Sequence, residues 1–269
     1  MLTKPNPTAV GICNAGCCAL VVLVRGEWLH TAHVGDVRAV LATTGPPQPL
    51  AGTEASTASC PDMTSSSSPV RRSVRRSAMK AAVRSVALSK DHTCYDRDEE
   101  KLVRARCVND PNPIRGSRPS GGRQIKRVAG SLAVTRAIGD LYLKDGRFSS
   151  LPHVNHLPYI TATPATASRR LNHPHDLFIV IGSDGVWDNA TNDDVVGWIL
   201  EHQSRSSKSS EESQEVIARV LAKVTERTRK ANWELTSLPP GPCRRRFHDD
   251  MTCTVILFTA FACLQKSRK

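Results

Sequence analysis

Residues Asp176–Val196, DLFIVIGSDGVWDNATNDDVV, decide how this chain folds. The stretch begins with an apolar run, Leu177–Ile181, of the length expected for a buried strand. Asp184 and Asp188 follow this run in a turn that contains two glycines. Asp-Gly pairs are ordinary turn residues, but carboxylates at the end of a strand can also hold a hard cation. This stretch alone leaves both interpretations of the two aspartates open.

Three helices are predicted from capping residues and apolar spacing. Thr191 is a predicted N-cap, and Asp194 three residues later forms a capping-box-like pair with it. A charged helix is predicted over Asp96–Arg106. Glu211–Asn232 has the clearest helical pattern. One apolar face of that helix is formed by Val216, Ile217, Val220, Leu221 and Val224.

Five further runs have the composition of β-strands. They are Cys17–Val24, Trp28–Val34, Val37–Ala42, Val83–Ser89 and Met251–Phe258. Short turns at residues 25–27 and 35–36 separate the first three, which predicts two successive hairpins in an antiparallel meander. Residues 43–82 are rich in Pro, Ser, Thr and Gly and are predicted to form a disordered insertion between two strands. Residues 109–122 carry several turn signals and are predicted to form a loop.

Carboxylates recur at the ends of these predicted strands. Asp36 follows the second run of the meander, and Asp249 and Asp250 precede the last strand. If these strands lie side by side with the strand before Asp184 and Asp188, four or five carboxylates converge on one edge. Such a cluster repels itself strongly unless cations hold it together. Ligation by oxygen alone selects Mg²⁺ or Mn²⁺ over Zn²⁺, and a pair of such ions suits in-line attack on a phosphate ester.

Composition limits the possible partners. The chain has 269 residues and a formal net charge of +12 at pH 7. Six of the 37 Lys and Arg residues lie between Arg71 and Arg84, where no acidic and no aromatic residue is present. The absence of aromatic side chains there disfavours base stacking and therefore a nucleic-acid partner. The sequence has no run of 18 apolar residues, so no membrane span is expected.

Cysteine usage indicates an intracellular protein. The nine cysteines are odd in number and form no CxxC pair, which is typical of reduced thiols. The cytoplasm or the nucleus is the expected compartment, and the mitochondrion stays open. A monomer is expected.

Five blocks of the sequence, taken in their order along the chain, indicate a relationship to a known family. They are GCCALVVLV…LHTAHVGDVRAVLAT, SVALSKDH, RVAGSLAVTRAIGD, FIVIGSDGVWD and HDDMTCTVILF. Together they resemble the metal-dependent protein phosphatases, the type 2C serine/threonine phosphatases. The segment LPYITATP and the Asp-Asp pair of HDDMT are most similar to the pyruvate-dehydrogenase-phosphatase-like branch of that family and to its plant relatives.

The resemblance implies a fold and a domain organisation. The implied fold is α+β, a four-layer α-β-β-α sandwich of two mainly antiparallel sheets flanked by helices. The phosphatase domain is expected over residues 11–260, with the insertion at 43–82 and a basic tail at 261–269. Within the Arg-Ala-Ile-Gly-Asp motif, Arg136 and Asp140 are expected to form a structural pair.

The resemblance also implies a site and a reaction. Asp184 and Asp249 correspond to ligands of a catalytic pair of Mg²⁺ or Mn²⁺ ions. Asp36, Asp184 and Asp188 correspond to residues around a third, more loosely held ion. The implied reaction is hydrolysis of phosphoserine or phosphothreonine in a phosphorylated protein by a metal-activated water.

The resemblance is incomplete at the amino terminus. Type 2C phosphatases begin with a block that supplies a phosphate-holding arginine, a metal-bridging Asp-Gly and a general-acid histidine. In this sequence the first arginine, acidic residue and histidine are Arg25, Glu27 and His30, all within the first hairpin. No catalytic residue is therefore identified, and an exposed sheet edge with uncovered apolar surface is expected.

Two hypotheses remain. One is a phosphatase whose amino-terminal part is missing from this sequence, so that the 269-residue chain itself turns over substrate very weakly. The other is a catalytically inactive pseudophosphatase that acts as a binding or regulatory module.

Overall fold

The computed structural model describes residues 12–46, 48–52, 83–117, 125–205, 212–231, 239, 241 and 249–258. Its strands are β1 (Gly16–Cys17), β2 (Ala19–Arg25), β3 (Trp28–Val34), β4 (Arg38–Thr43), β5 (Ala51–Gly52), β6 (Arg84–Ala87), β7 (Ile114–Ser117), β8 (Ile125–Val128), β9 (Ile138–Gly139), β10 (Ala165–Arg170), β11 (Asp176–Gly182) and β12 (Cys253–Leu257). Its α-helices are α3 (Arg97–Arg106), α4 (Asp184–Trp187), α5 (Asn192–Arg205) and α6 (Glu212–Ala231). Two short 3₁₀-helices, η1 (Leu141–Leu143) and η2 (Gly146–Phe148), complete the described elements.

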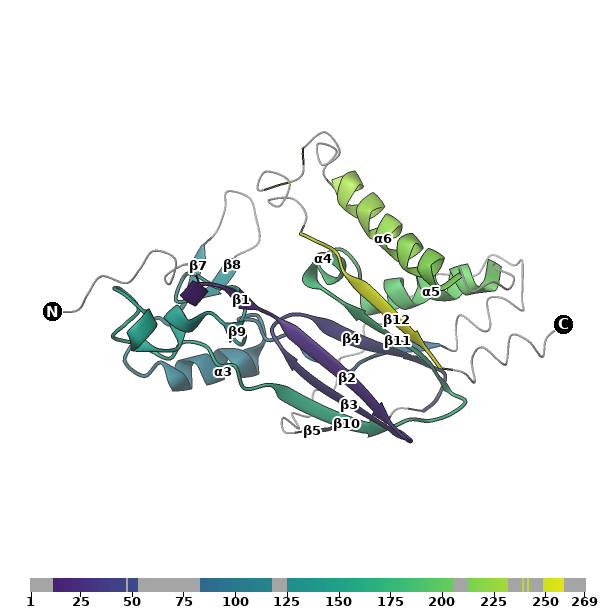
Figure 1. Ribbon diagram of the computed structural model, residues 1–269, viewed down its shortest axis with the longest axis horizontal. Coiled ribbons are helices and arrows are strands. Elements are labelled where there is room, and N and C mark those ends of the chain that lie inside the picture. The colour runs from purple at the N-terminus through teal and green to yellow at the C-terminus, as the bar shows by residue number, and fades with distance from the viewer. Residues whose placement is uncertain are drawn as a thin grey trace, which may run out of the picture. The chain divides into compact units, whose positions relative to one another are not determined.

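The strands form two four-stranded sheets (Figure 1). One sheet has the order β2-β3-β10-β5 and the other the order β12-β11-β4-β6. Two small antiparallel pairs, β1 with β9 and β7 with β8, are separate from them. The predicted α+β class, with mainly antiparallel sheets and flanking helices, is confirmed.

The chain forms two compact units. One consists of residues Met1–Val22, Thr31–Val37 and Ser89–Thr166, and the other of Leu23–His30, Arg38–Leu88 and Ala167–Lys269. The single phosphatase domain over 11–260 stays a prediction. Most of the predicted insertion at 43–82, including the basic residues before Arg84, and the whole tail at 261–269 lie outside the described residues.

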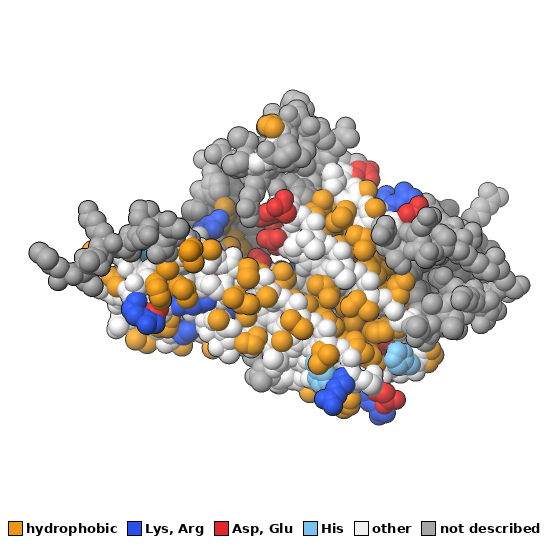
Figure 2. All heavy atoms as spheres, in the orientation of Figure 1, with side chains coloured by type: hydrophobic (Ala, Val, Ile, Leu, Met, Phe, Trp, Pro, Cys, Tyr) orange, Lys and Arg blue, Asp and Glu red, His pale blue; other side chains and the backbone are white. Residues whose placement is uncertain are grey.

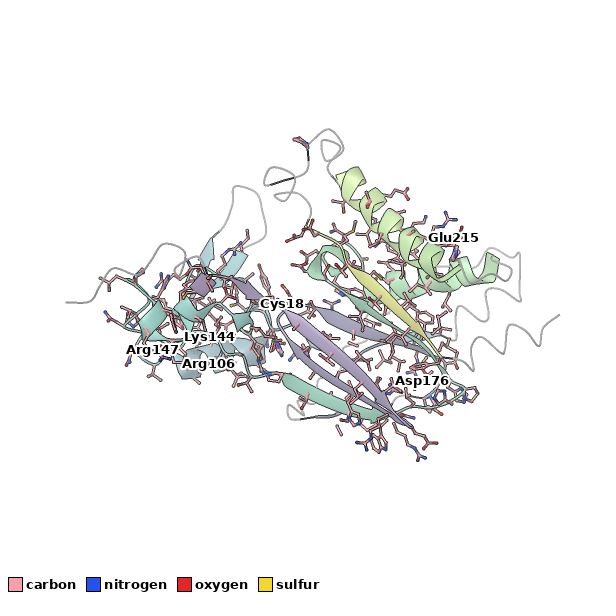
Figure 3. The ribbon with its side chains drawn as sticks, in the orientation of Figure 1. Cys18, Arg106, Lys144, Arg147, Asp176 and Glu215 are labelled. Atoms are coloured by element: carbon pink, nitrogen blue, oxygen red, sulfur yellow. The ribbon has the colours of Figure 1, made fainter. Side chains whose placement is uncertain are left out.

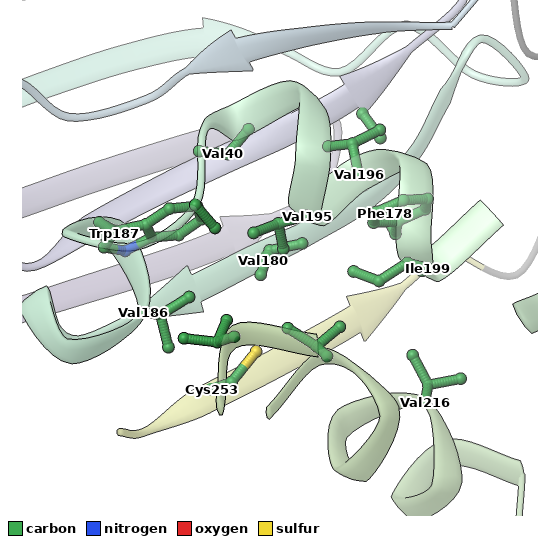
Figure 4. Packing of buried hydrophobic residues seen from close by; sticks show 14 of the residues in the cluster. Val40, Phe178, Val180, Val186, Trp187, Val195, Val196, Ile199, Val216 and Cys253 are labelled. Carbon is green, nitrogen blue, oxygen red and sulfur yellow. The ribbon is translucent and has the colours of Figure 1, made fainter. Parts of the chain in front are cut away.

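The core of the second unit is built on β11 and β4. β11 pairs antiparallel with β4 on one side and with β12 on the other. Figure 4 shows Phe178 and Val180 of β11 packing with Val195 and Ile199 of α5 and with Val216 of α6. Leu41 and Ile179 alternate along their strands with the residues that face the helices, so they lie on the other face of the sheet. They are also fully buried. Both faces of this sheet are therefore covered, as the apolar composition of Leu177–Ile181 predicts.

The cap of α5 has the predicted arrangement. Thr191 N–H and Oγ1 donate to Asp194 Oδ2 at 3.0 and 2.7 Å, and Asp194 N–H donates to Thr191 Oγ1 at 3.2 Å. Arg227 of α6 forms a two-point ion pair with the same carboxylate. The Arg227 guanidinium, with the Thr191 bonds, holds the pKa of Asp194 well below its usual range. Asp194, the second residue of the capping pair, thus also joins α5 to α6.

Two expectations about strands are wrong. The predicted second hairpin, between β3 and β4, does not form, because β4 lies in the other sheet between β6 and β11. β4 is buried along nearly its whole length, and a strand buried on both faces belongs at the centre of a sheet rather than in an exposed meander. The predicted loop at 109–122 contains β7, which pairs with β8 from Ile114↔Val128 to Ser117↔Ile125.

Strand β2 lies at an edge of its sheet among the described strands. Val21 and Leu23 of this strand are 63% and 54% exposed, and Trp28 at the start of β3 is 49% exposed. The expected sheet edge with exposed apolar side chains is thus present.

The first unit is held by a buried ion pair. Glu99 of α3 and Arg136 are each 4% exposed, and Arg136 Nε donates to Glu99 Oε1 at 3.1 Å. Thr135 Oγ1 donates to the same carboxylate. Burial alone would raise the pKa of Glu99, but the hydrogen bonds from Arg136 and Thr135 outweigh it and keep that pKa below its ordinary value.

The predicted pairing of Arg136 with Asp140 is therefore wrong. Asp140 adopts a left-handed conformation with φ of +46°, and its carboxyl group packs against the α-carbon of Gly16, where a Cβ would overlap it. Burial raises the pKa of Asp140. The neighbouring Lys144, labelled in Figure 3, donates to the carbonyl oxygens of Ala137 and Gly139 at 2.6 and 2.5 Å. Arg136 is thus structural, as expected, but with a different partner.

The buried ion pair can be tested against its neighbour in α3. Glu99→Gln leaves the Arg136 cation buried without its counter-charge, and we expect the free energy of unfolding to fall by about 3–5 kcal/mol. Glu100→Gln weakens two more exposed pairs, with Arg104 and Lys126, and should cost less than about 1 kcal/mol. Urea unfolding monitored by circular dichroism measures both. Equal losses for the two variants would contradict this account of the pair.

Candidate metal centre

The turn after β11 is shaped by a tryptophan. Trp187 Nε1 donates to the carbonyl oxygen of Gly182 at 2.8 Å, which folds the indole ring back over the end of the strand (Figure 4). A Cβ on Gly182 would lie 2.9 Å from that nitrogen, so only glycine fits this position without a shift. The ring is buried in the apolar core. Helix α4 is thereby fixed directly at the end of β11.

Ser183 joins this turn to the segment that leads into β12. Its N–H donates to the carbonyl of Thr252 at 3.0 Å, and its Oγ donates to the carbonyl of Asp250 at 3.0 Å. The same Oγ accepts from Thr252 N–H at 3.0 Å. A Cβ on Gly185 would lie only 2.5 Å from Asp250 O and 3.0 Å from Asp249 O. The two backbone segments are thus in direct contact.

Three predicted metal-site residues gather around α4. Asp184 is half-buried at the first position of the helix, and its Oδ1 accepts from Gly185 N–H at 2.8 Å. Asp188 is exposed at the other end of α4, where its N–H donates to Asp184 O at 2.8 Å. Asp249 is half-buried in the segment that contacts Gly185, and its Oδ1 accepts from Asp250 N–H at 2.8 Å. Acidic side chains gather beside α4 and the start of β12 in Figure 2.

Asp36, the fourth predicted residue, lies in the other compact unit. Its Oδ1 accepts from the Cys18 thiol at 3.2 Å. The preceding Gly35 has φ of +88°, and a Cβ there would overlap the Cys18 sulfur, so this turn requires glycine. The approach of Asp36 to Asp184 stays a prediction.

A histidine pair supports the Asp36 turn from within its own unit. His92 Nδ1 accepts from Gly35 N–H at 3.2 Å, and His92 N–H donates to Gly35 O at 2.9 Å. The His92 ring stacks on that of His33 with centroids 4.3 Å apart. Burial, with the neighbouring His33, lowers the pKa of His92 to about 3, so the ring is neutral and can accept this bond at physiological pH.

The donors around α4 suit a hard cation. Asp184, Asp188 and Asp249 offer carboxylate oxygens, the ligand type that Mg²⁺ and Mn²⁺ prefer. Among the described residues, no three His, Cys, Asp or Glu side chains already converge as a complete ligand set. The carboxylate donors thus fit the predicted ions by their chemistry. Because no complete ligand set is formed among the described residues, the assignment of the ligands stays a prediction.

Ser183, Gly185 and Trp187 are the residues of this centre that were not singled out from the sequence. The glycines of the Gly-Ser-Asp-Gly turn were visible as turn signals, but nothing in the sequence shows that Gly185 touches the segment before β12. That contact is between residues more than sixty positions apart, and it follows from the pairing of β11 with β12.

Comparison with known families identifies one match. The model of the family described as Protein phosphatase 2C matches residues 2–62 and 75–229. Probable protein phosphatase 2C 40 of Arabidopsis thaliana is 28% identical over 250 residues, which span 90% of this chain and 42% of that protein. Protein phosphatase 2C 35 of Oryza sativa subsp. japonica is 29% identical over 252 residues, 90% of this chain and 35% of that protein. The chain thus spans less than half the length of these two relatives.

Solved structures share the fold. A serine-threonine phosphatase 2C from Toxoplasma gondii matches with a TM-score of 0.53 and 14% identity, over 93% of this chain and 61% of that one. A C. elegans sex determining protein matches with a TM-score of 0.54 and 15% identity, over 93% of this chain and 42% of that one. Among the residues described here, no helix has both the length and the apolar composition needed to cross a membrane.

The contact at Gly185 can be tested by adding a single methyl group. Because Gly185→Ala places a Cβ 2.5 Å from a backbone oxygen, the turn or the β12 segment must shift, and we expect a loss of about 1–3 kcal/mol in the free energy of unfolding. Gly146→Ala is the control, since a Cβ there makes ordinary contact with Val154 at 3.7 Å. Urea unfolding compares the two variants. A Gly185→Ala protein as stable as the parent would refute the close contact.

Proposed function

Because this chain belongs to the protein phosphatase 2C family, we propose that it carries the carboxylate part of a divalent-metal centre for hydrolysis of phosphoserine and phosphothreonine in proteins. One observation carries the proposal. The Ser183 and Gly185 contacts hold the segments of Asp184 and Asp249 against each other at adjacent strand ends. Two backbone segments that are more than sixty positions apart in the sequence, each with one of these carboxylates, are thereby in contact, and this contact supports a metal site shared between them.

Each proposed residue has a distinct role. Asp184 and Asp249 hold a pair of Mg²⁺ or Mn²⁺ ions. Asp188 bounds a third and weaker site with Asp184, and the part of Asp36 in that site stays a prediction. When bound, such ions supply Lewis-acid activation of water and neutralise the charge of a phosphate ester. The protein supplies the fixed placement of the carboxylates, which the backbone bonds to Asp184 and Asp249 support.

The substrate in this proposal is a phosphorylated protein. Phosphate-ester hydrolysis is among the slowest uncatalysed reactions, so missing charge stabilisation costs orders of magnitude in rate. Among the described residues, no three His, Cys, Asp or Glu side chains converge as a complete ligand set. A second candidate is therefore a phosphatase-like module that binds partners without turnover. An intracellular location, a monomeric state and kinship with the pyruvate-dehydrogenase-phosphatase-like branch stay predictions.

Metal binding and turnover by the 269-residue chain test the proposal. We expect Mn²⁺ binding, measured by isothermal titration calorimetry, to weaken at least about tenfold in Asp184→Asn. Asp193→Asn, which changes an exposed carboxylate of α5, should bind Mn²⁺ as the parent does. Hydrolysis of a phosphothreonine peptide should be slow, require Mn²⁺ and disappear in Asp184→Asn.

Three outcomes separate the candidates. Metal-dependent turnover that is lost in Asp184→Asn supports the phosphatase. Mn²⁺ binding without any turnover favours the binding module. Unchanged Mn²⁺ affinity in Asp184→Asn contradicts the assignment of the site.

A further inference from the structure

Arg38 is tied to the candidate metal centre although it is not one of the predicted ligands. It is the first residue of β4 and lies opposite Gly182, the last residue of β11, in the register of the two strands. Gly182 is two positions before Asp184, so this half-buried arginine stands at the same end of the sheet as α4.

The Arg38 side chain packs on the residue that anchors α4. Its guanidinium carbon lies 5.3 Å from the centre of the Trp187 ring, within the range of a cation–π contact. The same indole also donates a hydrogen bond of 2.8 Å from its nitrogen to Gly182 O. The indole is thus held by a hydrogen bond at its edge and by a cation over its face.

Arg38 also reaches the next helix. Its Nη1 donates to Oδ1 of Asn192, the first residue of α5, at 2.9 Å. Helix α4 has only four residues, and Trp187, on which Arg38 packs, is the last of them. So short a helix has no stability of its own and takes its position from its contacts. One guanidinium therefore connects β4, α4 and the start of α5.

We propose that Arg38 is a positioning residue that holds α4 so that Asp184 and Asp188 keep the arrangement that binds divalent cations. This inference rests on the proposed function of the same site. Arginine suits the role because its planar group can stack on a ring and donate in its own plane at the same time. Lysine offers only a point charge and cannot satisfy both contacts in this way.

The test is the affinity of the 269-residue chain for Mn²⁺ in Arg38→Met, measured by isothermal titration calorimetry beside the melting temperature in the absence of metal. Methionine keeps an apolar side chain over Trp187 but removes the charge and the hydrogen bond. We expect affinity for Mn²⁺ to fall about tenfold or more, the effect typical of losing a group that orients metal ligands.

The chain offers a matched control in Arg227→Met. Arg227 also stacks on a tryptophan, with its guanidinium 4.8 Å from the Trp198 ring, and it pairs with Asp194 at 2.6 and 2.7 Å. It has the same chemistry as Arg38, but it joins α6 to α5 rather than holding α4. We expect Arg227→Met to lower the melting temperature and to keep the parent's affinity for Mn²⁺.

The outcomes are distinguishable. Parental Mn²⁺ affinity in folded Arg38→Met, or equal losses of affinity in Arg38→Met and Arg227→Met, would overturn the positioning role. A parent chain that binds no Mn²⁺ would contradict both this inference and the proposed function, whereas normal binding by the parent with no effect of Arg38→Met contradicts the inference alone. If Arg38→Met does not fold, Arg38→Lys decides the question, with weakened binding in a folded protein expected.

Discussion

The candidate centre depends on the close backbone contact between the turn after β11 and the segment that leads into β12. Ser183 joins the two segments by hydrogen bonds, and Gly185 allows them to touch because it has no side chain. Neighbouring strands lie only about 4.8 Å apart, so residues at the adjacent ends of β11 and β12 are necessarily close. Sheet pairing thereby brings together the segments that contain Asp184 and Asp249, which are far apart in the sequence.

The aspartates at the two ends of β11 differ in burial. At its start, Asp176 is fully buried and pairs with Arg169 at 3.1 Å, so the protein itself supplies the counter-charge (Figure 3). At its other end, Asp184 is half-buried and Asp188 is exposed, where a dissolved cation can reach them. The first arrangement serves structure. We propose that the second serves a metal site, next to the contact of Arg38 with Trp187 of the same helix.

Local signals predicted much of this structure. The apolar run Leu177–Ile181, the cap of Thr191 with Asp194 and the apolar face of α6 all depend on residues near one another in the sequence, and all three are confirmed. Long-range pairing was harder to predict. The turn at Gly35 and Asp36 looks like a hairpin, yet it sends β4 into the other sheet, because β4 is buried on both faces.

The candidate site also has residues that local signals predict and residues that depend on long-range contacts. Its aspartates could be named from their positions at strand ends and from the family resemblance, whereas Ser183, Gly185 and Arg38 depend on contacts with distant residues. Arg136 was correctly expected to be structural, but its partner Glu99 lies on α3, thirty-seven positions away. The identity of a buried partner is set by packing, which spacing along the sequence does not reveal.

The most direct test of the account is the position of manganese in crystals of the chain grown with Mn²⁺, located by anomalous diffraction. The account predicts an anomalous peak coordinated by carboxylate oxygens of Asp184 and Asp249. Manganese bound elsewhere, with these two carboxylates uncoordinated at millimolar Mn²⁺, would contradict it.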